Sequence, residues 1–440
     1  MDSNTEFTKK KTKKFTESSQ NLLNSSSIGS EKIMFVILSL VYVRPHFSFL
    51  PDLISVYWPD FVIALAAISY LLRNDNNKKR YTNISLSFKI SELVLLVGLL
   101  IPILIKFIVY GFSFDTLFAY SKLIYYYIVF ITFSRITSNV LFMKKKINKI
   151  IEISFIWNFF VSLIQLLAIP VFFDFVSIIY GTEKLRTIWT GYARVYGTFY
   201  NANWFGVYIL FIISWMNERM INKDIRPSRY FISWVIIIFM LVISGSRTAV
   251  MGAILITCIQ FMRGLSLRKV ITVFVVFIPV LLGIISIISQ IEILGRTLGR
   301  FTYMIDLILL NGFNMETLAG SRWPEWQNSL KVFYESPWIG SSINNFIPHN
   351  SYISVLIRFG LIGTIIMLFF IVMLAQRMKS TNLDNNTVFF LTASSGFTWG
   401  FLFVCIGGDY LFSTQVMLLL VTSLSIMQSS LRDSNSKTKK

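Results

Sequence analysis

The chain has 440 residues and a formal net charge of +19, and 54% of its residues are apolar while only 14% are charged. Soluble globular proteins carry about 45–50% apolar and about 25% charged residues. The composition therefore excludes a water-soluble enzyme, a disordered chain and a fibrous chain, and it predicts a helical protein that crosses a membrane many times.

Long apolar segments recur along the whole chain, and a membrane-crossing helix needs about 20 such residues. They predict an all-α polytopic membrane protein with about twelve transmembrane helices. The expected spans are 33–50, 53–72, 90–110, 115–134, 151–173, 203–216, 231–243, 248–262, 270–289, 350–374, 388–406 and 411–428.

The basic residues are distributed unevenly between the segments that join these spans. If the N-terminus lies inside, 29 of the 41 Lys and Arg residues fall in segments predicted to be inside and 10 in segments predicted to be outside. Cytoplasmic loops carry an excess of Lys and Arg. The bias predicts that both termini are cytoplasmic, and it explains the positive charge without nucleic acid as a partner.

This topology divides the chain into five parts. They are a basic cytoplasmic tail over 1–32, nine helices within 33–289 with an outer loop at 174–202, a long extracytoplasmic loop over 290–349, three helices within 350–428, and a cytoplasmic tail over 429–440. The long loop exceeds what a simple connection needs. After Pro324 it contains a pattern typical of an interfacial amphipathic helix, with Trp323, Trp326 and Trp338 at the level of the lipid headgroups.

The segment 194–206 (RVYGTFYNANWFG) leads directly into the sixth predicted span. Gly197 permits a tight turn, and Asn201 and Asn203 are residues that cap helices. Arg194 then lies near a helix N-terminus, where an anion is favoured. The pattern fits a phosphate group, although a capped helix with an incidental arginine explains it equally well.

Two further arginines lie at predicted outer turns. Ser244–Arg247 (SGSR) resembles an anion-binding nest, although a tight turn with an outward-pointing Arg247 explains it more simply. Arg322 lies just before the predicted amphipathic helix, again near a helix N-terminus. A helix resting on the membrane with no chemical role remains the alternative.

His349 lies where the long loop enters the tenth predicted span, in the sequence PHNSY, and the chain contains only two histidines. A lone histidine is more often structural than catalytic. At this interface, however, a histidine next to Asn350 is accessible from both water and lipid, and histidine is readily poised as a base near neutral pH.

Motifs for nucleotides and metals are absent. The sequence has no D-x-D, P-loop, H-E-x-x-H or G-x-S-x-G pattern, and Cys258 and Cys405 have no nearby ligand partners. We therefore expect no cofactor and no metal. The substrate itself must therefore be activated, and a glycan linked to polyprenyl pyrophosphate meets this requirement.

Four segments resemble, in order, the O-antigen ligase and polymerase superfamily of bacterial surface-polysaccharide assembly. They are RVYGTFYNANWFG, VISGSRTAV, GSRWPEWQNSLKVFYESPWIG and PHNSYISVLIRFGLIG, together within 186–365. The resemblance implies a GT-C-like, metal-independent, inverting glycosyltransferase in the bacterial cytoplasmic membrane.

The same resemblance suggests roles for individual residues. Arg194 and Arg322 are expected to bind pyrophosphate, and His349 is expected to act on the acceptor hydroxyl. Arg186 and Arg247 are secondary pyrophosphate-binding candidates, and the supporting residues are Asn203, Asn350 and Tyr352. Arg186 and Gly197 form an Arg–x10–Gly pattern that resembles one described in the outer loops of polymerases. A second copy of this pattern is missing from the long loop. Arg358 is left out because nine helical positions place it opposite His349.

The resulting hypothesis is a polymerase that joins lipid-linked oligosaccharide repeats, with a chain-length regulator and a flippase as possible partners. The 27-residue gap between Arg322 and His349 is shorter than in many ligases and favours this activity. A ligase acting on a lipid, protein or wall acceptor is the closest rival. A flippase or exporter is less favoured, because it would carry ionisable groups near the membrane midplane, whereas the charged candidates here lie in outer loops. A non-enzymatic scaffold would leave the loop motifs unexplained.

Overall fold

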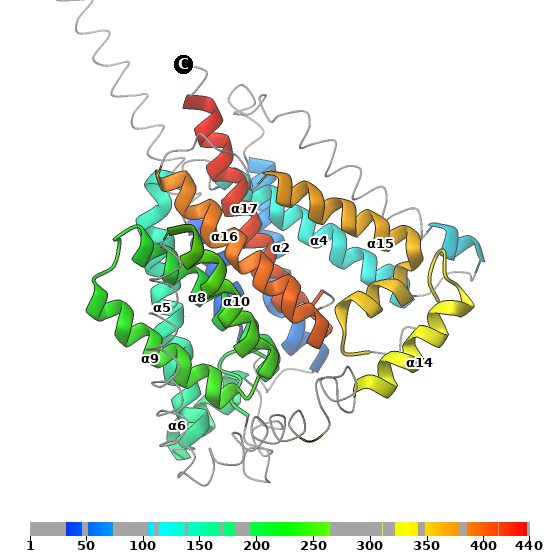
Figure 1. Ribbon diagram of the computed structural model, residues 1–440, viewed down its shortest axis with the longest axis horizontal. Helices are drawn as coiled ribbons and strands as arrows, with labels where there is room; N and C mark the ends of the chain where they lie inside the picture. Colours follow the sequence, from blue (N-terminus) through cyan, green and yellow to red (C-terminus); the bar gives the residue numbers. More distant parts are fainter. Residues whose placement is uncertain are drawn as a thin grey trace, which may run out of the picture.

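The computed structural model describes residues 32–45, 52–73, 104–109, 114–136, 140–167, 170–180, 194–264, 310, 322–341, 348–377, 385–411 and 413–437. Within these ranges the chain is almost entirely helical and forms no strand (Figure 1). The described part therefore agrees with the predicted all-α class.

The labelled helices follow one another in chain order. They are α2 (Asp52–Arg73), α4 (Phe114–Ile136), α5 (Val140–Leu167), α6 (Pro170–Tyr180), α8 (Ala202–Ile221), α9 (Pro227–Ser244), α10 (Arg247–Gly264), α14 (Arg322–Glu335), α15 (Ser351–Arg377), α16 (Asn385–Val404), the short 3-10 helix η3 (Cys405–Gly407) and α17 (Thr414–Lys437). Unlabelled helical segments cover 32–42 and 104–109.

Five of the described helices are long and apolar enough to cross a membrane. They cover Lys144–Leu167, Pro227–Ser244, Ser351–Phe369, Thr387–Gly407 and Thr414–Leu431, and shorter apolar helices cover Lys32–Tyr42 and Trp58–Leu72. The structure is thus that of a helical membrane protein, but it does not confirm twelve spans. The ninth expected span, 270–289, and most of the third, 90–110, lie outside the described residues.

Two predicted spans differ in detail from the observed helices. The segment expected as one span at 151–173 contains the end of α5 and the start of α6, and α6 begins at Pro170. Proline lacks an N–H group and is tolerated in the first turn of a helix. The first helix ends at Tyr42, before the expected end at 50, and Arg44 beyond it pairs with Asp60 of α2.

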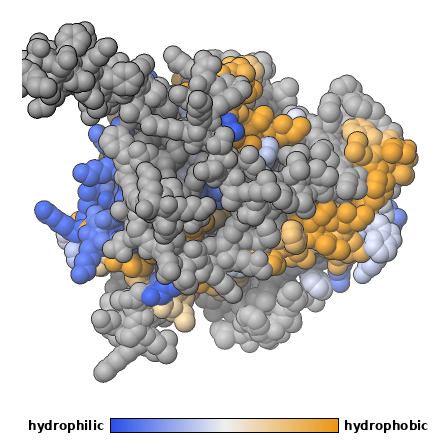
Figure 2. Space-filling model, turned by 90° about the horizontal axis from the view of Figure 1, so that it is seen from above, coloured by the Kyte–Doolittle hydropathy of each residue, from blue (hydrophilic) through white to orange (hydrophobic). Residues whose placement is uncertain are grey.

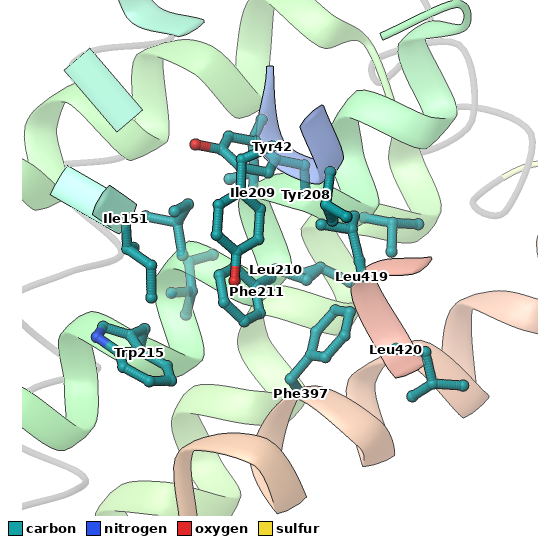
Figure 3. Close-up of a cluster of buried hydrophobic side chains, with 14 of the residues drawn as sticks. Tyr42, Ile151, Tyr208, Ile209, Leu210, Phe211, Trp215, Phe397, Leu419 and Leu420 are labelled. Atoms are coloured by element: carbon teal, nitrogen blue, oxygen red, sulfur yellow. The ribbon is translucent and has the colours of Figure 1, made fainter. Parts of the chain in front are cut away.

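The hydrophobic core surrounds α8, which is buried along most of its length and packs against α9, α10, α16 and α17. The ring of Phe211 lies 5.2 Å from that of Tyr42 and 5.4 Å from that of Phe397 on α16 (Figure 3). A helix that is apolar on all sides belongs in the interior of a protein.

The outer surface of the bundle is apolar over wide areas. Large apolar side chains are exposed on several helices, including Phe61, Ile153, Phe160, Ile365 and Phe369. Figure 2 shows such a surface from above, with hydrophilic side chains gathered at one edge. Exposed apolar patches of this extent are typical of surfaces that meet lipid or another protein.

Candidate active site

The turn at 194–200 precedes α8 and holds Arg194 in a defined position. Gly197 has a φ of 54°, as the predicted tight turn requires, and Asn201 is the N-cap of α8, its side chain accepting from the N–H of Asn203 at 2.8 Å. Arg194 donates from Nη2 to Asn203 Oδ1 at 2.6 Å and from Nε to the carbonyl of Ser244 at 2.9 Å. Both the turn and the cap were predicted from the sequence.

Two buried amide side chains of α5 bind the backbone of this turn. Gln165 accepts from the N–H of Gly197 at 3.0 Å and donates to its carbonyl at 2.7 Å, and Asn158 accepts from the N–H of Thr198 at 3.1 Å. The sequence analysis missed both residues. The available signal was a pair of amides seven positions apart in an apolar run, which places them on one helix face.

The SGSR turn lies directly beside the Arg194 turn. Gly245 has a φ of 58° and ends α9, and Arg247 is the exposed first residue of α10. The N–H of Val195 donates to the carbonyl of Ile243 at 3.0 Å. The structure therefore brings together two motifs that are separated by about 50 residues in the sequence.

A loop formed by residues 405–411, which we call the central loop, brings Arg322 to the same region. The Nη1 group of Arg322 donates to the carbonyl of Gly407, and Gly407 also lies against the side chain of Thr248. Tyr410 of this loop is affected electrostatically by both Arg322 and Arg194. Burial, the largest effect, raises the pKa of Tyr410, while Thr248 and the two arginines lower it.

His349 is attached to the central loop through the start of α15. Its side chain is exposed, and its φ of 47° is unusual for a residue other than glycine. The Oγ of Ser351 donates to the carbonyl of Gly408 at 2.7 Å and accepts from the N–H of Tyr410 at 2.8 Å. The loop that contacts Arg322 therefore also fixes the first turn of α15.

The supporting residues Asn350 and Tyr352 hold the start of α15. Asn350 caps the helix, because its Oδ1 accepts from the N–H groups of Tyr352 at 3.0 Å and Ile353 at 3.2 Å. The hydroxyl of Tyr352 donates to the carbonyl of Leu402 at 2.6 Å. Asn350 thus keeps the residue before it, His349, at the edge of the helix.

Asp409 is a further residue of this region that the sequence analysis missed. It pairs with Arg358 at 3.5 Å. Burial raises the pKa of Asp409, whereas Arg358, Ser354 and His349 are among the groups that lower it. Arg358 and His349 therefore both lie within electrostatic range of one carboxylate. The spacing argument that placed Arg358 opposite His349 does not apply, because His349 precedes α15 and has a positive φ.

The amphipathic helix predicted in the long loop is α14. Trp326, Ser329 and Phe333 form its buried side, while Tyr334 and the following Trp338 are exposed. The helix packs against α15 and lies beside its first half in Figure 1. Its amphipathic character agrees with the prediction, and its first residue is Arg322.

The remaining predicted residues can now be placed. Arg186 lies outside the described residues. Arg322 binds the central loop, Arg194 binds the SGSR turn that carries Arg247, Thr248 after that turn contacts Gly407 of the loop, and His349 lies at the helix that this loop fixes. In the ranges that the structure covers, no group of three His, Cys, Asp or Glu side chains is arranged to hold a metal ion.

Together these features define a helical membrane protein in which Arg322 and the helix that follows the exposed His349 bind the same loop. Residues 232–368 match the family model described as O-antigen ligase. This match confirms the resemblance to the O-antigen polymerase and ligase superfamily, and it includes the SGSR turn, Arg322 and His349. A comparison with curated proteins gives no match.

Proposed function

We propose that this protein is a polymerase that joins polyprenyl-pyrophosphate-linked oligosaccharide repeats into a surface polysaccharide. The growing chain is the donor and is transferred as a block from its lipid carrier, and a new lipid-linked repeat is the acceptor. The observation that carries the proposal is that Arg322 and the His349 end of α15 both bind the central loop, while Arg194 binds the SGSR turn, which is followed by Thr248 in contact with Gly407 of that loop.

The proposed reaction needs one base and one anion-binding group. An acceptor hydroxyl oxygen attacks the anomeric carbon of the donor, and its proton passes to His349. The bond from that carbon to the pyrophosphate oxygen breaks, so the configuration inverts and polyprenyl pyrophosphate leaves. Arg194 and Arg322 stabilise the negative charge that develops on the leaving group. The step requires no metal ion.

The positions of the three groups support these roles. Arg194 is oriented by an amide oxygen and a backbone carbonyl, and Arg322 by another carbonyl. These contacts orient the guanidinium groups, and arginine stays protonated in proteins, so both side chains can serve as cationic anchors for phosphate oxygens. His349 is exposed and therefore accessible to an acceptor.

In our proposal the reaction takes place on the outer face of the cytoplasmic membrane and both termini lie in the cytoplasm, and the distribution of Lys and Arg supports this orientation. A flippase that delivers the repeats and a regulator of chain length are the protein partners that we propose. The polyprenyl chain of the substrate would lie against the apolar outer surface of the bundle.

A ligase is the second candidate, because the matching family model is described as O-antigen ligase. A ligase uses the same chemistry with another acceptor. Purified protein in proteoliposomes, given lipid-linked repeats alone, should form polymers longer than two repeats. If no polymer forms and single repeats are instead transferred to an added acceptor such as lipid A core, the ligase is correct and the polymerase proposal fails.

A further inference from the structure

The helix α15 is broken at Gly360, nine residues after it begins. Gly360 has φ 65° and ψ −165°, values that do not occur in a helix. A break inside a helix leaves backbone N–H and carbonyl groups without their usual intrahelical partners. Inside a membrane such groups must find other partners, since no water is available to bind them.

The segment 337–341, which follows α14, binds the backbone at this break. The N–H of Leu361 donates to the carbonyl of Pro337 at 2.8 Å, and the N–H of Ser341 donates to the carbonyl of Ile357 at 2.7 Å. The N–H of Ile362 also donates to the carbonyl of Trp338, at 3.3 Å. The end of the long loop and the broken helix therefore satisfy each other's backbone groups.

Glycine is required on both sides of this contact. Gly340 has a φ of 78°, and a Cβ at that position would collide with the carbonyl of Ile357. A Cβ at Gly360 would collide with the carbonyl of Trp338. The two backbones thus approach more closely than any side chain permits.

Lys106, from the helical segment 104–109, binds backbone carbonyls on both sides of this contact. Its Nζ donates to the carbonyl of Ser341 at 2.7 Å and to the carbonyl of Arg358. The side chain is 8% exposed, and the adjacent Phe107 packs against Val355 and Phe359 of α15. Hydrogen bonds from an ammonium group to carbonyls are stronger than those between neutral groups.

The contact formed by 337–341, Gly360 and Lys106, which we call the backbone clasp, joins two elements of the candidate site. It follows α14, which begins with Arg322, and it holds α15, which begins two residues after His349. The fourteen residues of α14 extend about 20 Å, so a small rotation at the clasp moves Arg322 appreciably.

We propose that Lys106 is a positioning residue that fixes the long-loop helix to the broken helix and thereby sets the distance between the anion-binding Arg322 and the base His349. The proposal rests on the function given above. Lys106 does not touch substrate and acts through the carbonyls of Ser341 and Arg358.

The test compares Lys106→Met, which keeps the length of the side chain but cannot donate, with Lys106→Arg, which restores the donors. A displacement of about 1 Å in a reacting geometry costs about 10²-fold in rate. We expect kcat per folded protein to fall about 10²-fold in Lys106→Met, with the donor KM within about twofold and with recovery of most activity in Lys106→Arg. The exposed Lys331 of α14 offers a matched control, and Lys331→Met should retain wild-type kcat.

Hydrogen exchange provides a readout that does not depend on activity. The amides of Ser341 and Leu361 should exchange faster in Lys106→Met than in the wild type and should regain protection in Lys106→Arg. Unchanged exchange, or a fall in protein abundance with a normal kcat, would overturn the proposal. A wild-type protein that makes no polymer, combined with faster exchange in Lys106→Met, would contradict the proposed function and leave the clasp intact.

Discussion

Buried polar side chains have different hydrogen-bond partners near the two ends of α8. At one end, which we call the closed end, Ser214, Asn217, Glu218, Tyr230 and Gln260 bind mainly one another. Tyr230 donates to Asn217 Oδ1 at 2.8 Å, and Asn217 Nδ2 donates to Gln260 Oε1 at 3.1 Å. Gln260 Nε2 in turn donates to the carbonyl of Ser214 at 2.9 Å.

At the other end, which we call the site end, polar side chains bind the backbone of loops. Gln165 and Asn158 bind the turn at 194–200, and Arg322 and Ser351 bind the central loop. A closed network of side chains fixes how helices pack, whereas side chains bound to loop backbone fix where loop residues lie. The comparison predicts that changes at the site end affect the reaction and that changes at the closed end affect stability alone.

Apart from the loss of the base His349, the largest effect should come from Arg322→Ala. Loss of one preorganised group that stabilises developing charge costs about 10²–10³-fold in rate. Lysine should rescue only part of this loss, because it lacks the planar fork of arginine. The exposed Arg226 near the closed end offers a control, and Arg226→Ala should polymerise normally. If the Arg322→Ala variant is present at normal abundance and makes polymer of wild-type length, Arg322 does not bind the leaving group.

A pair of matched substitutions sharpens the comparison. Asn158→Leu and Gln260→Leu each leave a buried polar partner unsatisfied, at a cost of about 1–3 kcal/mol, and both should lower the melting temperature. Only Asn158→Leu should also lower kcat per folded protein, because the turn that carries Arg194 loses its support. Equal specific activities of the two variants would show that the two ends do not differ in role.

The smallest effect is a pH dependence at the closed end. Burial raises the pKa of Glu218 to about 7, above the ordinary value of 4.5. The folded state then binds more protons than the unfolded state between these values, so stability falls as pH rises through this window and is flat above it. Thermal unfolding between pH 5 and 8 should show this fall in the wild type and less of it in Glu218→Gln. Identical profiles would mean that Glu218 titrates normally.

Local features of the sequence predicted local features of the structure. Apolar runs correctly predicted helices, and the amphipathic pattern after Pro324 correctly predicted α14. The turn with positive φ at Gly197 and the cap at Asn201 were also predicted and are observed. Each of these depends on residues within a few positions of one another, which is the range over which propensity and periodicity act.

The missed residues act through contacts that are distant in the sequence. Lys106 reaches across 235 residues to Ser341, and Asn158 across 40 residues to Thr198. Asp409 meets Arg358 only because the central loop folds back onto α15. A polar residue in an apolar run signals that a partner exists, but the identity of that partner depends on the fold.

The central claim is that His349 removes the proton from the acceptor hydroxyl, and the most direct test is the rate of polymer formation by His349→Asn and His349→Gln in proteoliposomes. Asparagine tolerates positive φ, so His349→Asn keeps the backbone conformation while removing the base. A general base contributes about 10²–10⁴-fold in rate, and we expect both variants to lose activity in this range at normal abundance, with unreacted lipid-linked repeats accumulating. Polymer formation at the wild-type rate by either variant would contradict the account.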